Sequence, residues 1–182
     1  MNRKYYLSEE RVKVFEDTER LYKSDMELSK AVKESKNATR YYDEDADPMI
    51  YRSNRKCNVC VSNFRTYEAA KNAIDRNPGK RVAVLNFASA VTPGGGVKSG
   101  ASAQEECLCR CSTLLPVLER RYLKDKYYYP NRERNDRRNT DVVIYTPDIV
   151  VFKSDEETPS LMDRKDWYKV DVLTCAAPDL RN

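Results

Sequence analysis

The residues best suited to chemistry are gathered in one short loop. Four of the protein's five glycines lie between Pro93 and Gly100, in the sequence PGGGVKSG. Gly94, Gly95 and Gly96 carry no Cβ atoms, so this backbone can lie directly against a ligand and point its N–H groups at an anion. The loop follows an apolar, strand-like run, and in open α/β sheets ligands bind where strands end. The pattern therefore predicts a ligand site.

Other interpretations of the loop explain less of the pattern. A flexible surface loop would not account for the strand before it and the helix after it. A P-loop requires Gly-Lys-Ser/Thr, whereas Lys98 and Ser99 follow Val97. A dinucleotide-binding fingerprint, GxGxxG, would place its last glycine at Ser99. A degenerate P-loop and a dinucleotide site are therefore both disfavoured.

Three polar residues, Gln104, Glu105 and Glu106, follow at the start of the next expected helix. Acidic residues are common there because they complement the helix dipole, which is the plain structural explanation. Neighbours on a helix point about 100° apart, so we expect only one glutamate to face a cleft squarely. Such a pair cannot flank a sugar as the two carboxylates of conventional glycosidases do. Hydrolysis here would use one carboxyl group, first as acid and then as base.

The composition excludes several kinds of site. The chain has no histidine, so Ser–His and Cys–His catalysis and all histidine-containing zinc sites are excluded. Cys57 and Cys60 form a CxxC on an expected strand, where they would point to opposite faces. Cys107, Cys109 and Cys111 alternate on an expected helix and diverge. We therefore expect reduced thiols and neither a metal nor a cofactor.

The charge pattern gives no indication of nucleic-acid or membrane binding. The net charge of +4 is small and mixed with acid. The basic cluster from Arg132 to Arg138 is interrupted by acids, and we interpret it as a solvated loop rather than a phosphate-binding patch. No apolar run approaches the roughly 20 residues of a membrane span. The N-terminus shows no signal peptide, so a cytoplasmic location is expected.

Strand-like and helix-like segments alternate, which predicts an α/β sheet with crossover connections. A long helix is expected over residues 8–35. The expected strands cover 56–63, 81–87, 141–146, 149–153 and 169–175. Two further helices are expected over 66–77 and 103–123, the latter bent at Pro116. The runs 81–87 and 169–175 are apolar enough for strands that are buried on both faces.

The stretch VLNFASAVTPGGGVKSGASAQEECLCRCS, residues 84–112, resembles the signature of microbial-type poly(ADP-ribose) glycohydrolases. The core of this signature is a triple glycine, seven further residues and Gln-Glu-Glu. The similarity extends more weakly to YTPDIVVF (145–152) and to LTCAAPD (173–179), where the family usually has AAPN and Asp179 is a departure. The match covers most of the chain from about residue 55 onward.

This resemblance implies a macrodomain-like mixed or parallel sheet with flanking helices. It also implies hydrolysis of the ribose–ribose O-glycosidic bonds of poly(ADP-ribose), with that polymer, ADP-ribose and ADP-ribosylated proteins as partners. Glu106 would be the catalytic acid and base, assisted by Glu105. The expected substrate contacts are Gly94, Gly95, Gly96, Val97, Gln104 and Ser89, with the glycine N–H groups facing the diphosphate.

The family normally continues into a second glycine-rich loop, which this sequence lacks. We therefore expect residues 1–50 to be a helical extension and 51–182 to be the N-terminal part of a catalytic domain that is incomplete at its C-terminus. The alternatives are an ADP-ribose-binding module without turnover and an inactive remnant.

Overall fold

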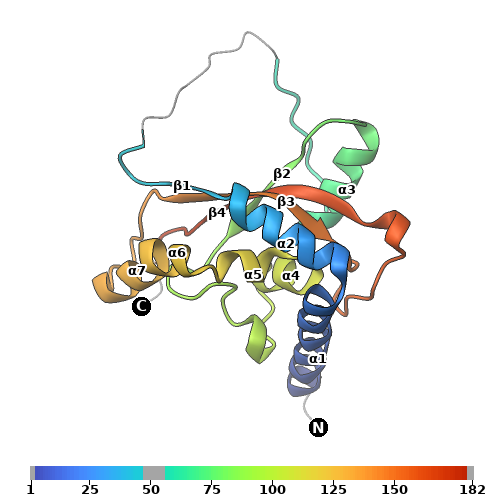
Figure 1. Cartoon of the computed structure of the whole chain (residues 1–182), viewed down its shortest axis with the longest axis horizontal. Coiled ribbons are helices and arrows are strands. Elements are labelled where there is room, and N and C mark those ends of the chain that lie inside the picture. Colours follow the sequence, from blue (N-terminus) through green and yellow to red (C-terminus); the bar gives the residue numbers. More distant parts are fainter. Residues whose placement is uncertain (1–2, 47–55, 180–182) are drawn as a thin grey trace.

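The computed structural model describes residues 3–46 and 56–179. It is a mixed α/β fold in which helices pack on a four-stranded sheet (Figure 1). The strands lie in the order β1-β3-β4-β2, and only β2 and β4 run parallel. Their bounds are Arg40–Tyr42 for β1, Ala83–Phe87 for β2, Val143–Val151 for β3 and Tyr168–Cys175 for β4. The predicted mixed sheet with flanking helices is confirmed.

β4 is one of the two inner strands and pairs with β3 on one side and with β2 on the other. Val170 and Val172 are buried on one face of β4, whereas the other face includes the exposed Lys169 and the half-buried Leu173, so the predicted burial on both faces is confirmed for one face only. The two strands predicted over 141–146 and 149–153 are one strand, β3. The pairing register shifts between Thr146 and Ile149, so the intervening residues form a bulge instead of a chain break.

β2 lies where a strand was predicted, but it is not buried on both faces, as the sequence had indicated. β2 is the outer strand of the sheet, and its residues are alternately exposed and buried. Val84 and Asn86 face the helices, whereas 41% of Leu85 and 60% of Phe87 are exposed. Among the described residues, therefore, helices cover only one face of this strand.

The N-terminal helix predicted over 8–35 is two helices, α1 (Arg3–Ser24) and α2 (Met26–Ala38). Asp25 lies between them with an extended backbone. Its carboxylate accepts hydrogen bonds from the backbone N–H groups two and three residues later, at 3.0 and 3.1 Å. The prediction of one continuous helix was wrong because this side chain caps a new helix at that point.

The helix predicted over 103–123 is also divided. α4 (Gln104–Cys111) ends at Ser112, and α5 (Leu114–Leu118) begins two residues later. Between them, the N–H of Thr113 donates to the Val150 carbonyl at 3.0 Å, and the Thr113 hydroxyl accepts from the Val150 N–H at 3.0 Å. Pairing with β3 therefore interrupts the helix, whereas Pro116 lies harmlessly in the first turn of α5.

Shorter helical segments complete the structure. The segment after α5 contains α6 (Arg121–Leu123), a π-helical turn (Lys124–Tyr128) and α7 (Tyr129–Arg134). The predicted helix over 66–77 is confirmed as α3 (Thr66–Arg76), which lies beside β2. The predicted strand over 56–63 was wrong: these residues are exposed and have no regular secondary structure. Cys57 and Cys60 therefore do not lie on a strand that would point them to opposite faces.

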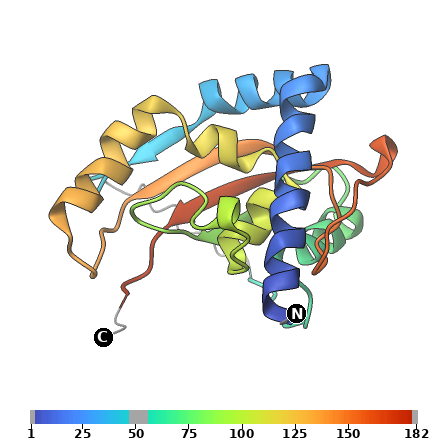
Figure 2. The same ribbon diagram turned by 90° about the horizontal axis from the view of Figure 1, so that it is seen from below.

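The two N-terminal helices are part of the main hydrophobic core. Phe15 and Tyr22 from α1 and Leu28 from α2 are buried in the same cluster as residues from α4, α5, β3 and β4. Figure 2 shows α1, in dark blue, crossing the sheet and the other helices. The predicted boundary near residue 50 lies in the segment outside the described residues.

Buried polar contacts fix α1 in place. Lys153, 2% exposed, donates to the Val14 carbonyl at 2.9 Å and pairs with Asp17 at 2.8 Å. The hydroxyl of Thr18 donates to the carbonyl of the buried Arg110 at 2.6 Å. Since an unsatisfied buried donor would be costly, these bonds define one position of α1 against α4 and the sheet.

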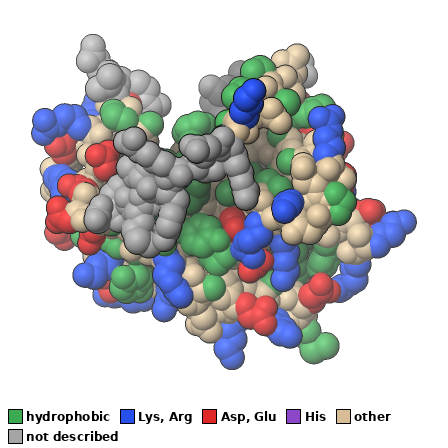
Figure 3. All heavy atoms as spheres, turned by 90° about the horizontal axis from the view of Figure 1, so that it is seen from above, with side chains coloured by type: hydrophobic (Ala, Val, Ile, Leu, Met, Phe, Trp, Pro, Cys, Tyr) green, Lys and Arg blue, Asp and Glu red, His purple; other side chains and the backbone are tan. Residues whose placement is uncertain are grey.

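The described residues contain no helix that is both long enough and apolar enough to cross a membrane. On the face shown in Figure 3, basic and acidic side chains are interspersed.

We expect Asp25→Ala to lower the free energy of unfolding by about 1 kcal/mol, the usual cost of losing an N-cap. Asp25→Asn retains the capping oxygen but loses the charge that pairs with Arg164. It should therefore cost clearly less than the alanine variant in urea denaturation. Equal losses in the two variants would assign the effect to the ion pair instead of the cap.

Candidate active site

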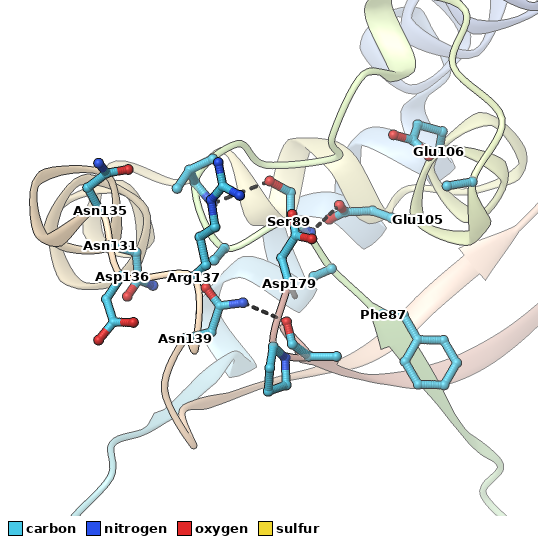
Figure 4. Close-up of a pocket in the computed structure, with 16 residues that line it drawn as sticks. Phe87, Ser89, Glu105, Glu106, Asn131, Asn135, Asp136, Arg137, Asn139 and Asp179 are labelled. Atoms are coloured by element: carbon cyan, nitrogen blue, oxygen red, sulfur yellow. Dashed lines mark hydrogen bonds between the residues drawn. The ribbon is translucent and has the colours of Figure 1, made fainter. Parts of the chain in front are cut away.

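A cleft of about 720 Å³ opens where β2 and β4 end. One wall is the start of the glycine loop together with the first turn of α4. The opposite wall is formed by residues 131–139 and 177–179 (Figure 4). The lining residues are Phe87, Ala88, Ser89, Ala90, Val91, Ala103, Glu105, Glu106, Asn131, Asn135, Asp136, Arg137, Asn139, Ala177, Pro178 and Asp179.

Glu105 is 3% exposed, and three donors hold its carboxylate. The N–H groups of Ser89 and Gly94 donate to it at 2.8 and 3.1 Å, and the amide of Asn86 donates at 3.4 Å. Two of these donors belong to the loop and one to β2. The strand end and the loop therefore both orient this carboxylate.

Glu106 is 7% exposed, and one donor holds its carboxylate. The N–H of Gly96 donates to Oε1 at 2.8 Å. The other oxygen, Oε2, is buried and has no hydrogen-bond partner among the described residues. One oxygen is thus fixed by the loop, and the second is a buried acceptor that no described residue uses.

Both glutamates line the same cleft, contrary to the expectation that only one would. They lie in the first turn of α4, and the glycine loop wraps around this N-terminal end of the helix. Because each carboxylate is drawn to a different loop amide, the 100° between their Cα–Cβ directions does not separate them.

The glycines are required by the closeness of this wrapping. Gly94 and Gly95 have φ of 69° and 54°, a left-handed backbone that disfavours side chains. A Cβ on Gly95 would clash with Oε1 of Glu106, and one on Gly96 would lie 2.8 Å from the Ala101 side chain. The loop can therefore cover the carboxylates only where these side chains are absent.

The N–H groups of Gly94, Gly95, Gly96 and Val97 are all engaged within the protein. Gly94 and Gly96 donate to the two glutamates, as described above. Gly95 donates to the Thr92 carbonyl at 3.0 Å and Val97 donates to the Gly94 carbonyl at 3.2 Å. The expected contact of these N–H groups with a diphosphate would require the loop to change its bonds. In this structure they instead position the carboxylates.

The other predicted contact residues have mixed environments. Gln104 bonds to the outer edge of β2: its carbonyl accepts from the Phe87 N–H at 2.8 Å and its amide donates to the Leu85 carbonyl at 2.9 Å. It does not line the cleft. Val97 is 1% exposed and belongs to the core. Ser89 does line the cleft.

Asn86 is a site residue whose importance the sequence reasoning underestimated. Its amide donates to Glu105 and also to the Thr174 hydroxyl at 3.2 Å, so it connects the carboxylate to both β2 and β4. The signal available in the sequence was a polar asparagine near the end of an otherwise apolar strand.

The opposite wall includes part of the cluster from Arg132 to Arg138. Its arginines are exposed, as expected of a solvated loop, but Arg132 and Arg134 belong to α7, and Arg137 and its neighbours line the cleft facing the glutamates (Figure 4). The wall is fixed by a bond from the Asn139 amide to the Ala177 carbonyl at 2.6 Å and by one from the Asp179 N–H to the Arg137 carbonyl at 2.8 Å. The pairing partners lie far apart in the sequence, so no local pattern predicts this arrangement.

Burial raises the pKa of the Glu105 carboxyl from 4.5 to about 7. The hydrogen bonds from Ser89, Asn86 and Gly94 oppose this rise because they favour the charged form. The nearby charge of Glu106 adds to it. Near neutral pH, Glu105 can therefore hold a proton inside the cleft.

Within residues 3–46 and 56–179, no three potential metal ligands are grouped together. The six cysteines are free thiols, with Cys57 and Cys60 exposed and Cys109 and Cys111 buried.

We expect Gly95→Ala to destabilise the protein more than Gly79→Ala. Both glycines have left-handed backbones, with φ of 54° and 78°, but a Cβ on Gly79 would meet nothing within 4 Å. The Gly79 variant therefore measures the backbone cost alone, and the contact with Glu106 should add about 1–3 kcal/mol. Chemical denaturation of the two variants tests this. Similar losses would mean that the loop is not pressed against the carboxylate.

The raised pKa of Glu105 predicts a pH-dependent stability. Between pH 4.5 and about 7, the folded protein keeps the proton that the unfolded chain has lost, so stability falls as the pH rises through this window. We expect the loss to approach about 3 kcal/mol relative to Glu105→Gln, which has no proton to lose. Glutamine also places an NH2 group where a carboxylate oxygen accepted a hydrogen bond, but this loss of stability does not depend on pH.

The test therefore measures how the free energy of unfolding changes with pH in wild type, in Glu105→Gln and in Glu133→Gln, a control at an exposed position. The control should run parallel to wild type. If the curve of Glu105→Gln also runs parallel to wild type, the pKa of Glu105 is the same in the folded and the unfolded protein, and the prediction is wrong.

Comparison with known proteins identifies the architecture. The family model for the catalytic domain of microbial-type poly(ADP-ribose) glycohydrolase (PARG) matches residues 8–154. No curated protein sequence matches the chain significantly.

Crystal structures of bacterial enzymes have the same fold. The chain is 28% identical to PARG from Thermomonospora curvata, with a TM-score of 0.80 over 92% of this chain and 64% of that one. PARG from Deinococcus radiodurans, in complex with ADP-ribose, gives 28% identity and a TM-score of 0.66 over 81% of this chain and 57% of that one. The chain thus spans less than two thirds of the length of these enzymes. It belongs to the family of microbial-type poly(ADP-ribose) glycohydrolase catalytic domains.

Proposed function

We propose that this chain carries the acid/base centre of a poly(ADP-ribose) glycohydrolase, which hydrolyses ribose–ribose O-glycosidic bonds and releases ADP-ribose. One observation carries the proposal: two adjacent buried glutamates are held by the amides of a glycine loop in a cleft large enough for a ligand. Membership of the PARG family supports it, as does the ADP-ribose bound by the Deinococcus radiodurans enzyme.

Glu106 is the proposed general acid and base. Gly96 holds Oε1, so the carboxyl group cannot rotate freely, and Oε2 has no described protein partner. The protonated acid donates its proton to the departing ribose oxygen as the glycosidic C–O bond breaks and an oxocarbenium ion forms. The carboxylate then accepts a proton from the water that attacks the same carbon. Both steps return Glu106 to its starting state.

Glu105 is proposed to orient the sugar and to adjust the charge beside Glu106. Below its pKa of about 7 it can donate a hydrogen bond to a ribose hydroxyl, and above that value it can only accept one. Its three hydrogen bonds leave it little freedom to move between acid and base positions. Ser89, whose backbone holds Glu105 and which also lines the cleft, is proposed to contact the ribose.

The two carboxyl groups lie on the same wall of the cleft, so they do not flank the bond as in conventional glycosidases. A single group therefore serves as acid and then base. The proposed ligands are poly(ADP-ribose), ADP-ribose and ADP-ribosylated proteins. A macrodomain-like architecture and a cytoplasmic location remain predictions from the sequence. The roles of Gln104, Val97 and the glycines as direct substrate contacts remain predictions too.

We expect Glu106→Gln to lower the rate of ADP-ribose release from poly(ADP-ribose) by about 10²–10⁴-fold, the usual contribution of a general acid or base. Glutamine keeps the shape and the acceptor for Gly96, so the affinity for ADP-ribose should change little. The measurements are turnover of the polymer and calorimetric binding of ADP-ribose by the same variant.

Glu105→Gln and the exposed Glu133→Gln serve as comparisons. Full activity of Glu106→Gln with an inactive Glu105→Gln would reverse the two roles. A wild-type chain that binds ADP-ribose without any turnover would instead be a binding module.

A further inference from the structure

A second cleft lies across the glycine loop from the glutamate cleft, and the proposed reaction does not use it. Its volume is about 460 Å³, within the range of about 300–1,000 Å³ that is common for ligand pockets. The loop forms one side, and the segment from α5 to α7 forms the other. The residues that matter for its chemistry are Gly95, Gly96, Lys98, Glu119, Lys124 and Arg132.

The two clefts share a wall that is one chain thick. Val91 lines the first cleft and Thr92 the second, while in α7 Asn131 lines the first and Arg132 the second. Nη2 of Arg132 donates to the Val91 carbonyl at 2.8 Å and so ties the loop to α7. Figure 2 shows the yellow-green loop beside these orange helical turns. An extended ligand could therefore pass from one cleft into the other over this wall.

The charges of the second cleft favour an anion. Lys98 pairs with Glu119 at 2.8 Å, and these two charges compensate each other. Lys124 and Arg132 form no ion pair with the described residues, which leaves two uncompensated positive charges. The Arg132 guanidinium lies 5.7 Å from the centre of the Tyr129 ring, a cation–π contact that restrains its position.

We propose that this second cleft binds a diphosphate group. Two separate cations match two linked phosphates, whereas a single carboxylate would leave one cation unmatched. Gly95 and Gly96 allow the ligand to approach the backbone, but their N–H groups are already engaged with Thr92 and Glu106. Recognition therefore depends on the side chains of Lys124 and Arg132.

The proposed function supplies one source of this group, and the inference rests on it to that extent. In poly(ADP-ribose) every unit carries a diphosphate, so the second cleft would hold the unit next to the one being cleaved. A free nucleoside diphosphate is the other source with the same chemistry.

The binding test is calorimetric titration of the whole chain with inorganic pyrophosphate. We expect Lys124→Gln to weaken binding by about tenfold, the usual effect of losing a charge-assisted hydrogen bond. Lys126→Gln is the matched control: it removes the same charge two residues away, from an exposed side chain that lines neither cleft. Equal pyrophosphate affinities of these two variants would overturn the proposal.

Arg132→Gln should also weaken pyrophosphate binding, but it removes the bond to Val91 as well, so the lysine pair remains decisive. These measurements do not require turnover. If Glu106→Gln and wild type are equally inactive, the proposed hydrolase function fails while the pyrophosphate result still decides the second site.

Kinetics on long poly(ADP-ribose) decide whether the diphosphate in the second cleft belongs to the neighbouring polymer unit or to a free nucleoside diphosphate. A several-fold higher KM of Lys124→Gln with unchanged kcat, and unchanged inhibition by ADP-ribose, identifies the neighbouring polymer unit as the ligand. Weaker pyrophosphate binding with an unchanged KM supports the site and identifies a free diphosphate, which titration with ADP would then detect.

Discussion

The hydrogen bonds between the glycine loop and the carboxylates of Glu105 and Glu106 are the interaction on which the site depends. Each bond places a backbone N–H against a buried carboxyl oxygen, and this contact is possible only because the loop lacks side chains there. The same bonds shape the loop, whose two faces then line two separate clefts. Without the carboxylates, the amides of Gly94 and Gly96 would be left without acceptors.

Helix α1 supports the end of the glycine loop. Gly100 ends the loop with φ of 77°, and the space where its side chain would be is occupied by the backbone of Ser8. Ser8 also donates a hydrogen bond to the Ser99 carbonyl at 3.1 Å. The N-terminal helix therefore supports the loop directly, and through Thr18 it supports α4 as well. A segment that the sequence suggested to be an extension thus belongs to the framework of the site.

Burial of Glu105 has an energetic cost, which is visible in the raised pKa of its carboxyl group, and the nearby charge of Glu106 adds to it. A fold selected for stability alone would gain from removing one of them, since a buried carboxyl group loses hydration. Their retention in a cleft is consistent with chemical use, because perturbed carboxyl groups gather at functional sites. Asn86 and Ser89 limit the cost by donating to the carboxylate and, at the same time, fix its direction.

The sequence by itself determined the α/β class, the strands β2 and β4 and the stretch that carries the site. These follow from local properties: apolar runs, glycines that permit left-handed backbone and acids at a helix start. Only the tertiary structure decided that both glutamates share one cleft, that Asn86 links them to the sheet and that residues 131–139 form the opposite wall. The helix breaks at Asp25 and Ser112 were likewise missed, because a capping side chain and pairing with β3 overrode helical periodicity. Contacts between segments distant in sequence leave no local pattern, since they depend on how the chain packs.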